Sequence, residues 1–207
     1  MLIEWLGHSC FRITDKGYSL VIDPYRPGMV PGLGRLHVTT NKVICSHNHD
    51  DHNYVDAVTI VQNKTAVPFA IKSYPSFHDE EKGKKRGKNS ITLIESNGIR
   101  VAHLGDLGCE LDKKTAEKLK NIDALMIPVG GHFTIGPAEA KKICDDIEPR
   151  VIIPMHYQGK GFGFSVLARV DAFASLFPSD RIKRYSGNSI EIDQDTARQL
   201  ALLSLCQ

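Results

Sequence analysis

The sequence predicts a mixed α/β (α+β) fold in which strands predominate and most helices enter in the second half. Two observations lead to this fold class. Short apolar or alternating runs follow one another in the first third of the chain, and strand-like runs alternate with helical patterns after it. The 207 residues, 42% of them hydrophobic, suffice to bury a core. No shift in composition marks a boundary, so we expect a single domain over residues 1–207.

The first third of the chain predicts a meander, because its apolar runs are separated by turn residues such as Gly7 and Gly17. The strand-like runs cover residues 2–5, 10–14, 19–23 and 42–46. The last of them leads directly into a histidine-rich segment. After that segment, residues 56–62 are a candidate for a short helix.

The remainder of the chain alternates strands with helices. Strand-like runs cover residues 67–71, 90–95, 100–104, 124–129 and 151–155. Helical patterns cover residues 111–121, 137–147 and 165–176. The second helix has a proline in its first turn and ends before Pro149, as start and stop signals require. The C-terminus adds a strand pair at 182–185 and 189–192, then an apolar tail at 200–205 that suits either core or interface.

Composition argues against several classes of partner. The formal net charge of +2 and the pI near 8.2 are too mild to indicate a nucleic-acid or membrane-surface partner. No apolar run approaches the roughly 20 residues of a membrane helix, and the N-terminus lacks the pattern of a signal peptide. We therefore expect a soluble, cytoplasmic protein that acts on a small molecule. The sequence leaves the oligomeric state open.

The pattern of cysteines also favours a cytoplasmic location. They are scattered and form no C-x-x-C pair, which favours reduced thiols in a cytosol over a disulfide framework or a zinc ribbon. The five are Cys10, Cys45, Cys109, Cys144 and Cys206.

The strongest chemical signal is the H-x-H-x-D-H pattern of residues 47–52. His47, His49, Asp51 and His52 place three imidazoles and a carboxylate in one loop after a strand. Neutral imidazole and carboxylate are ligands that Zn²⁺ prefers. Because side chains alternate along an extended chain, His47 and His49 can point the same way. Asp51 and His52 can reach a second point nearby, and this arrangement suits two metal ions about 3.5–4 Å apart. A polar surface turn is the alternative, and a chance cluster of this density is rare.

This pattern resembles the signature of the metallo-β-lactamase-fold hydrolase superfamily, and matching segments run in order from about residue 1 to about residue 160. Residues 5–11 (WLGHSCF) and 20–24 (LVIDP) resemble the first strands of a small subgroup that contains ascorbate-phosphate lactonase-like and uncharacterised Zn-dependent hydrolases. The later matches are FHD at 77–79, HLGD at 103–106, FTIGP at 133–137 and IPMHY at 153–157. The C-terminal quarter carries no such motif.

The resemblance implies a four-layer αβ/βα sandwich, with two mixed sheets face to face, helices outside and the metal site at one edge between the sheets. It also implies two sets of metal ligands joined by a bridging Asp106. The first set is His47, His49 and His78, and the second is Asp51, His52 and His156. Three of these residues each follow a strand-like run: His78, Asp106 and His156. We therefore expect all three at one rim of the sheets. Zinc is the expected metal, and manganese, iron or nickel suit the same ligands.

The expected reaction is hydrolysis of an ester-like bond, in a lactone, thioester, amide or phosphoester, by a hydroxide formed on the two metal ions. A phosphodiesterase or nuclease on the same fold is one alternative. The charged residues 80–88 (EEKGKKRGK) could lean over the site and bind phosphates, but an exposed loop is the simpler interpretation of this segment. A non-catalytic metal-binding protein is another. Seven ligands without cysteine argue against a closed structural site and favour catalysis. An iron-dependent redox or sulfur-transfer activity is a third.

Several polar residues near these motifs have open roles. Asp51 and His132 are the candidate catalytic residues, the latter as a substrate contact or an acid. His8 is either a plain turn histidine or a residue that orients a metal ligand. Asp23 either orients a ligand histidine or opens an Asp-Pro turn. For His103, a packed and hydrogen-bonded histidine is favoured over a ligand.

Overall fold

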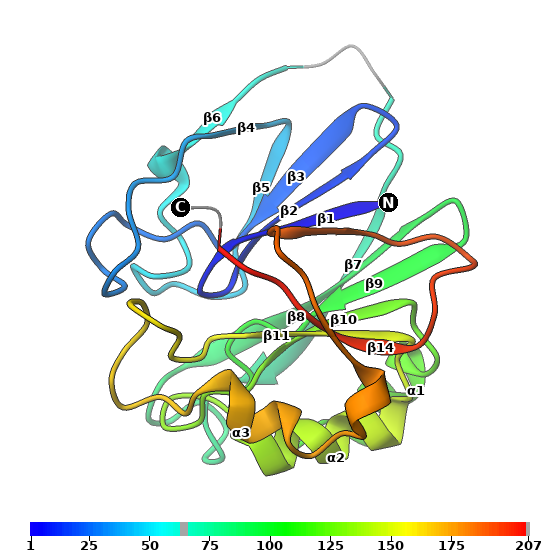
Figure 1. The fold of residues 1–207 in the computed structure, drawn as a ribbon. Coiled ribbons are helices and arrows are strands. Elements are labelled where there is room, and N and C mark those ends of the chain that lie inside the picture. Colours follow the sequence, from blue (N-terminus) through cyan, green and yellow to red (C-terminus); the bar gives the residue numbers. More distant parts are fainter. Residues whose placement is uncertain (63–65, 206–207) are drawn as a thin grey trace.

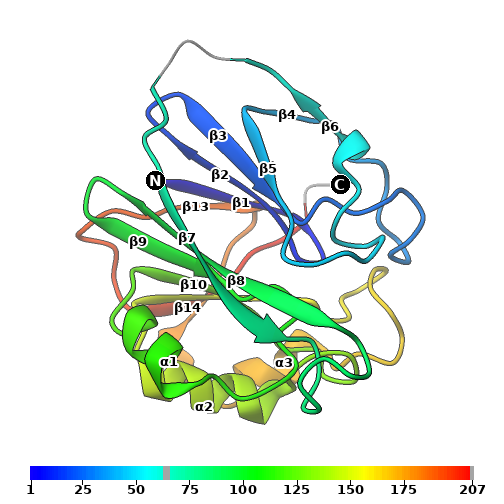
Figure 2. The ribbon, with the colours of Figure 1, turned by 180° about the vertical axis from the view of Figure 1, so that it is seen from behind.

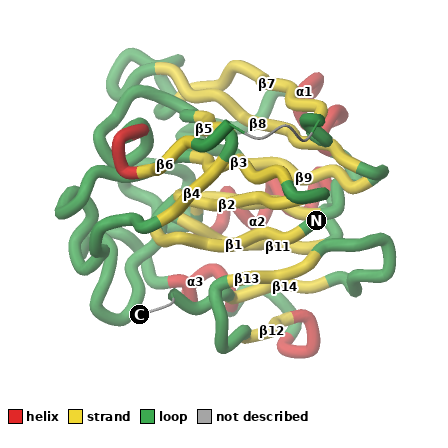
Figure 3. Tube along the Cα trace, turned by 90° about the horizontal axis from the view of Figure 1, so that it is seen from above, coloured by secondary structure: helices red, strands yellow, loops and turns green. Residues whose placement is uncertain are grey.

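Two mixed β-sheets pack face to face, and the α-helices lie on the far side of one of them (Figure 1). The structure is a computed structural model and describes residues 1–62 and 66–205. Figure 2 shows the same layers from behind, and the view from above in Figure 3 shows long loops gathered at one end of both sheets. The predicted fold class, a mixed α and β protein with two mixed sheets, is confirmed.

The upper sheet of Figure 1 has five strands in the order β13-β1-β2-β3-β5. Neighbouring strands are antiparallel except β3 and β5, which are parallel. Side chains alternate between the two faces of this sheet, so Leu20 and Ile22 enter the core between the sheets while Val21 faces away from it. The strands are β1 (Leu2–Gly7), β2 (Cys10–Asp15), β3 (Tyr18–Ile22), β5 (Lys42–Ile44) and β13 (Ser189–Glu191).

The lower sheet has seven strands in the order β12-β14-β11-β10-β9-β8-β7. The five strands from β12 to β9 are parallel, and β8 is antiparallel to both of its neighbours. As a result β7, β9 and β11 run in one direction and end at the same edge. The strands are β7 (Ala70–Phe77), β8 (Lys88–Ser96), β9 (Ile99–His103), β10 (Ala124–Pro128), β11 (Val151–Met155), β12 (Ile182–Arg184) and β14 (Gln199–Leu202).

Three α-helices of the described residues cover the outer face of the lower sheet: α1 (Lys113–Leu119), α2 (Pro137–Ile147) and α3 (Val170–Ala174). The α2 helix buries Ala140, Ile143, Cys144 and Ile147, which lie on one helical face. The outer face of the upper sheet is covered differently, by β4 (Val38–Thr40), the short 3₁₀ turn η1 (Val55–Ala57) and β6 (Val58–Ile60). There a second apolar cluster forms around Val21, Val38 and Val58.

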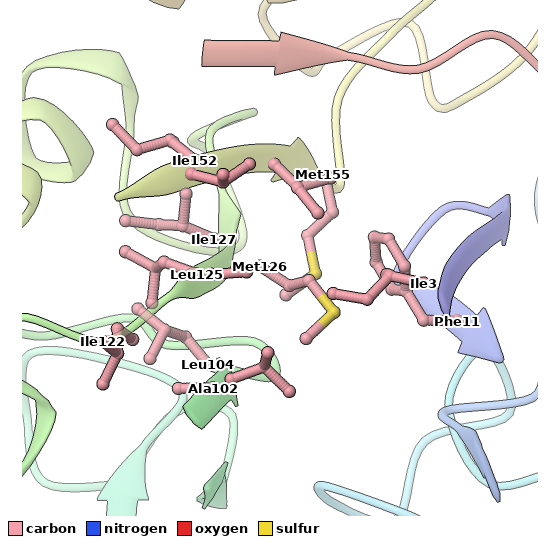
Figure 4. Close-up of a cluster of buried hydrophobic side chains, with 14 of the residues drawn as sticks. Ile3, Phe11, Ala102, Leu104, Ile122, Leu125, Met126, Ile127, Ile152 and Met155 are labelled. Atoms are coloured by element: carbon pink, nitrogen blue, oxygen red, sulfur yellow. The ribbon is translucent and has the colours of Figure 1, made fainter. Parts of the chain in front are cut away.

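The main core lies between the sheets and continues beneath the lower one. Figure 4 shows Met126 and Met155 reaching toward Ile3 and Phe11 of the upper sheet, while Leu125 points to the other side, toward the helices. Every residue of β10 and β11 is buried, because both faces of these central parallel strands are covered. The packed core therefore fixes the ends of the strands relative to one another, and with them the loops that follow these strands.

Most predicted elements are present, and the bounds of α2 and β11 agree with the prediction to the residue. The helix predicted at 56–62 is wrong. Only the turn η1 forms there, and the β-branched run of Val58, Thr59 and Ile60 makes β6, which pairs with β4. The strand predicted at 67–71 instead spans Ala70–Phe77. Pro75 is tolerated because β7 is an edge strand.

The C-terminal predictions also need correction. The strands predicted at 182–185 and 189–192 do not pair with each other, because β12 pairs with β14 in the lower sheet and β13 pairs with β1 in the upper sheet. The apolar tail at 200–205 contributes to β14, so it is core. The helix predicted at 165–176 shrinks to α3, because Ala168 donates its N–H to the Gly130 carbonyl and leaves the helical pattern.

Two other expectations bear on the environment of the protein. No helix among the described residues combines the length and the apolar character that crossing a membrane would require. The four cysteines in the described part of the chain are free thiols. Cys206 lies outside the described residues.

Candidate metal centre

Loops that follow four strands bring the candidate ligands together at one edge of the sandwich. His78 directly follows β7, Asp106 lies shortly after β9, and His156 directly follows β11. The segment 47–52 comes from the other sheet, after β5. Because β7, β9 and β11 run in the same direction, their C-terminal ends open at the same edge, on the loop-rich left side of Figure 1.

The carboxylate of Asp106 lies at the centre of this cluster. Its Oδ2 atom is 3.2 Å from Nε2 of His52, of His78 and of His156, and 3.9 Å from Nε2 of His47. Asp106 is buried, and the pKa of its carboxyl lies well below the ordinary value. Burial alone would raise this pKa, but the facing rings of His156 and His52 outweigh that effect.

The backbone around Asp106 is fixed by a buried asparagine of β8. The side-chain oxygen of Asn89 accepts the N–H of Asp106 at 3.0 Å, and its amide nitrogen donates to the Leu104 carbonyl and to Ser76 Oγ. Gly105 has a φ of +55°, and a Cβ at this position would lie 2.3 Å from the asparagine oxygen. The turn therefore requires glycine, and it presents the aspartate at one defined position.

His47, His49 and His78 form the first group of the cluster, with ligand nitrogens within 4.8 Å of one another. The hydroxyl of Ser46 donates to Asp23 Oδ2 at 2.6 Å, so it accepts from Nδ1 of His47 at 2.9 Å. The proton of that ring is thus on Nδ1, and the lone pair of Nε2 faces the cluster. Burial, followed by the neighbouring His52 ring, lowers the pKa of His47 to about 3, which keeps its ring neutral.

Asp23 is fully buried beneath the cluster and holds His52. Its carboxylate accepts the backbone N–H and the hydroxyl of Ser46, and it accepts Nδ1–H of His52 at 2.9 Å. Of the two roles that the sequence leaves open, the structure therefore shows the orienting one. Although Asp23 also lies close to His47, its oxygens are taken by these hydrogen bonds. A carboxylate behind a ligand histidine fixes the tautomer and the ring orientation.

Asp51, His52 and His156 form the second group, and His8 joins it, again with ligand atoms within 4.8 Å of one another. The Nε2 atom of His8 donates to Asp51 Oδ2 at 3.3 Å, and its ring centroid lies 4.1 Å from that of His156. The His8 carbonyl accepts the indole N–H of Trp5 and the backbone N–H of His156. His8 therefore contacts Asp51 through its ring and His156 through its carbonyl. It is not a plain turn histidine without a role at the cluster.

The residues of the cluster fit bound metal ions. Two ligand atoms that are each about 2.0–2.1 Å from a tetrahedral zinc ion lie about 3.3 Å apart. The 3.2 Å separations between Asp106 Oδ2 and the nitrogens of His78 and His156 match that geometry. Among the described residues, buried atoms without a hydrogen-bond partner include Nε2 of His47, Nε2 of His52 and Oδ1 of Asp106. Buried polar atoms normally have a partner, and a cation between them would supply it.

The electrostatics of the cluster also favour a bound cation. Burial alone would lower the pKa of His52, but the carboxylates of Asp106 and Asp23 raise it well above the ordinary value. Burial would raise the pKa of Asp51, and the hydrogen bond from His8 together with the His52 ring lowers it instead. The carboxylates therefore stay ionised and attract positive charge to the positions between the rings.

Two glycines allow the chain to pass close behind the ligands. A Cβ on Gly108 would lie 2.3 Å from the backbone carbonyl of His78, and one on Gly130 would lie 2.1 Å from that of His156. Both contacts are with backbone atoms, which cannot swing aside. Neither glycine carries a chemical motif, so the sequence does not indicate that each supports one of the two ligand groups.

A cavity of about 560 Å³ opens onto the cluster. Its lining includes residues of both groups, Asp106, and Asn48 and Asp50 from the histidine-rich segment. It also includes side chains that the sequence did not place at the site: Met29, Arg86, Phe133 and Phe164. For Arg86 a signal existed, since the charged segment 80–88 follows His78, but its simpler interpretation was an exposed loop. Phe133 belongs to a matched segment, whereas Met29 and Phe164 have no distinguishing sequence context.

His132 lies apart from the cluster. It is exposed and lines a different cavity of about 370 Å³, together with Cys109 and Glu139, and it is absent from the lining of the cavity at the metal ligands. Its ring packs edge-on against Phe133, with centroids 4.5 Å apart, so the phenylalanine and not the histidine faces the cluster cavity. The structure does not bring His132 together with the other predicted site residues.

His103 is packed behind the site, as the sequence favours. It is fully buried, and both ring nitrogens are engaged. Nε2 donates to the Ser9 carbonyl at 2.9 Å, and Nδ1 accepts the backbone N–H of Gly105 at 3.0 Å. Burial lowers its pKa. With no free lone pair, the ring supports the Gly105 turn and is not available as a ligand.

Comparison with known proteins identifies the family. Residues 2–156 match the model of the beta-lactamase superfamily domain. The chain is similar to the crystal structure of a candidate Zn-dependent hydrolase of the metallo-β-lactamase superfamily from Thermotoga maritima. The two share 35% sequence identity over 99% of each chain, with a TM-score of 0.77.

Two further relatives agree. A UPF0173 metal-dependent hydrolase from Natranaerobius thermophilus is 25% identical over 186 residues, covering 76% of this chain and 83% of that protein. Igni18, a metallo hydrolase from Ignicoccus hospitalis, is 20% identical, covers 84% of this chain and 91% of its own, and has a TM-score of 0.62, which shows a shared fold. The chain therefore belongs to the beta-lactamase superfamily, with the metallo-β-lactamase fold and the His/Asp cluster of a metal-dependent hydrolase.

Proposed function

We propose that this metal-dependent hydrolase holds two divalent metal ions, zinc by preference, and hydrolyses an ester-like bond of a small molecule. One observation carries the proposal: a single oxygen of Asp106 lies 3.2 Å from imidazole nitrogens of both ligand groups. A carboxylate in that position suits a bridge between two ions. The first ion is assigned to His47, His49 and His78, and the second to Asp51, His52 and His156.

Two such ions, when bound, supply the positive charge that lowers the pKa of a water molecule and polarises a carbonyl or phosphoryl group. The side chains of this chain do the rest. Asp23 orients His52, Ser46 orients His47, and His8 donates a hydrogen bond to Asp51. These hydrogen bonds hold His52, His47 and Asp51 before substrate arrives, which limits reorganisation during the reaction. Lactones, thioesters, amides and phosphoesters are the substrate classes that this chemistry serves.

The proposal includes a cytoplasmic location and a small-molecule substrate. The free thiols of the four described cysteines suit a reducing compartment. The cavity of about 560 Å³ beside the cluster lies in the size range of small-molecule sites. Cell fractionation with a detectably tagged chain tests the location, and detection only outside the cytosolic fraction would contradict it.

Replacement of Asp106 tests the metal assignment. Asp106→Asn removes the bridging charge, so we expect loss of at least one metal ion per chain and a fall in hydrolysis of lactones, thioesters and phosphodiesters by several orders of magnitude. Metal content is measured by elemental analysis of protein purified with and without added zinc. Asp56→Asn is the matched control, because that aspartate is exposed and lines no part of the cluster cavity. Full metal content and full activity in Asp106→Asn would refute the proposal.

A further inference from the structure

Arg86 occupies an unusual position for a residue of a highly charged turn. It belongs to the connection between β7 and β8, and its side chain lines the cavity at the metal ligands. Its guanidinium carbon lies 5.7 Å from the centroid of the Phe133 ring. Within the part of the chain that the structure describes, no carboxylate pairs with Arg86, whereas its neighbour Lys85 pairs with Glu81 at 2.5 Å.

The backbone of this turn is held by one carboxylate. The two oxygens of Asp79 accept the backbone N–H groups of Glu81, Gly83, Lys85 and Arg86 at distances of 2.7–3.0 Å. These hydrogen bonds lower the pKa of the Asp79 carboxyl, although desolvation opposes them. The position of Arg86 is therefore set by the fold of the turn and does not depend on a partner for its own charge.

The same turn is closed onto a metal ligand. Gly87 donates its N–H to the Gly83 carbonyl at 3.0 Å, and the Gly87 carbonyl accepts the N–H of His78 at 3.1 Å. Gly83 has a φ of +80°, and a Cβ there would lie 2.7 Å from the Gly87 carbonyl oxygen. The chain therefore needs glycine at this point, and the resulting turn connects the backbone of Arg86 to that of His78 at close range.

Aromatic side chains form the wall between Arg86 and the cluster. The rings of Phe133 and Phe164 meet edge to face with centroids 5.9 Å apart, and Phe133 lies 6.5 Å from the His156 ring. A guanidinium that lies over an aromatic face keeps its in-plane N–H donors for another partner. Arg86 is thus the cationic side chain of the cavity, and the two phenylalanines form an adjoining apolar wall. The rest of the lining includes the predicted metal ligands, Asn48, and Asp50, whose carboxylate pairs with Arg26.

We propose that Arg86 binds an anionic group of the substrate, a carboxylate or a phosphate, while the ester-like bond lies against the metal ligands. The substrate class is then small acids that carry an ester, lactone or thioester, and neutral esters are poorer substrates. This inference rests on the proposed function. The planar fork of arginine matches the two oxygens of either anion, and such charge-assisted pairs are strong when partly shielded from water.

Matched pairs of substrates test this assignment on the zinc-loaded protein. The carboxylate arm compares monomethyl succinate with dimethyl succinate, and the phosphate arm compares monoacetylated glycerol 3-phosphate with monoacetylated glycerol. In the unsubstituted protein we expect kcat/KM to favour the anionic member of at least one pair by about 10- to 100-fold. The arm that shows the preference identifies the anion.

Two variants separate binding from general effects of charge. Arg86→Ala is expected to bring the anionic-to-neutral ratio of kcat/KM close to one, and Arg86→Lys to restore part of it. Lys84→Ala removes the same charge from an exposed side chain of the same turn, which does not line the cavity, and should keep the original ratio. A ratio near one in the unsubstituted protein, or a ratio that Arg86→Ala leaves unchanged, would overturn the inference.

A binding measurement distinguishes this inference from the proposed function. Titration calorimetry compares succinate with butyrate on zinc-loaded protein, because only succinate offers a second carboxylate to Arg86. We expect tighter binding of succinate, and loss of that difference in Arg86→Ala. If this pattern is found but no ester is hydrolysed, the anion-binding role of Arg86 stands and the proposed hydrolysis is wrong. Equal binding of the two acids overturns the inference even if hydrolysis is observed.

Discussion

Asp23 accepts a hydrogen bond from Nδ1 of His52 at 2.9 Å, while Nε2 of the same ring lies 3.2 Å from Asp106. The imidazole is thus fixed between a buried carboxylate behind it and the proposed bridging carboxylate in front. Such support usually changes metal affinity by about 10- to 100-fold. The strand end of β3 therefore contributes to the metal centre without supplying a ligand.

We expect Asp23→Asn to weaken zinc binding by about 10- to 100-fold, since an amide cannot accept all three hydrogen bonds that the carboxylate accepts. Competition with a chromophoric chelator measures the affinity on protein whose fold has been checked by circular dichroism. Asp145→Asn, at an exposed position of α2, is the control. If Asp23→Asn is less stable but binds zinc with unchanged affinity, Asp23 acts only on the turn.

Removal of metal should lower the melting temperature. A ligand at 100 times its Kd stabilises a protein by about 2.7 kcal/mol, which for a chain of this size corresponds to about 5–10 °C for each ion. Differential scanning fluorimetry of zinc-loaded protein before and after treatment with EDTA measures the change. Asp106→Asn should show a much smaller change, and an unsubstituted protein that melts at the same temperature in both conditions contradicts the metal assignment.

Gly108→Ala and Gly130→Ala are expected to disturb one ligand group each. The added Cβ meets the backbone of His78 in the first case and that of His156 in the second, so either the ligand moves or the strand end does. We expect a loss of zinc and a destabilisation of about 1–3 kcal/mol in each variant. Gly34→Ala provides the control, because a Cβ there meets nothing within 4 Å. Normal zinc content in both site variants would show that the ligands tolerate the displacement.

The N-cap of α1 predicts a dependence of stability on pH. The Asp112 carboxylate accepts from the hydroxyl of Thr115 and from the backbone N–H groups of Lys114 and Thr115, and these bonds lower its pKa below the ordinary 3.8. Because the pKa is lower in the folded state, the ionised carboxylate stabilises the protein fully above the ordinary pKa of 3.8. This stabilisation is lost as the pH falls through the folded-state pKa. Asp112→Ala should lower the free energy of unfolding by about 1 kcal/mol at pH 7, and by less as the pH falls below about 4.

Urea unfolding of both proteins over that pH range measures this difference. Asp145→Ala, which removes an exposed carboxylate paired with Lys141, serves as the control. A difference between Asp112→Ala and the unsubstituted protein that does not change with pH would mean that the ionised carboxylate is not the stabilising group.

The sequence indicated residues 47–52 directly, because three histidines and an aspartate stand together in one short segment. The resemblance to a known family supplied His78, Asp106 and His156, which are far apart in the chain and carry no such dense pattern of their own. The sequence offered residues 80–88 as a segment that could lean over the site but did not single out Arg86, because the place of that side chain depends on how the turn after β7 folds onto Asp79. The pairing of β12 with β14 was missed for a similar reason. An apolar run such as residues 200–205 does not show which strand it will join, since that choice is made by the tertiary packing of β11.

The turn held by Asp79 has a consequence for how this protein can change. Because one carboxylate binds the backbone of the turn, and backbone N–H groups are common to all residues except proline, most side chains between Glu80 and Arg86 can be replaced without altering the loop. Gly83 and Lys82 are exceptions that the geometry imposes, Gly83 because a Cβ would meet the Gly87 carbonyl and Lys82 because its φ of +57° disfavours β-branched side chains. The position of Arg86 can therefore accept new side chains while the backbone of His78 stays in place, so we expect substitutions there to change substrate preference and leave metal binding intact.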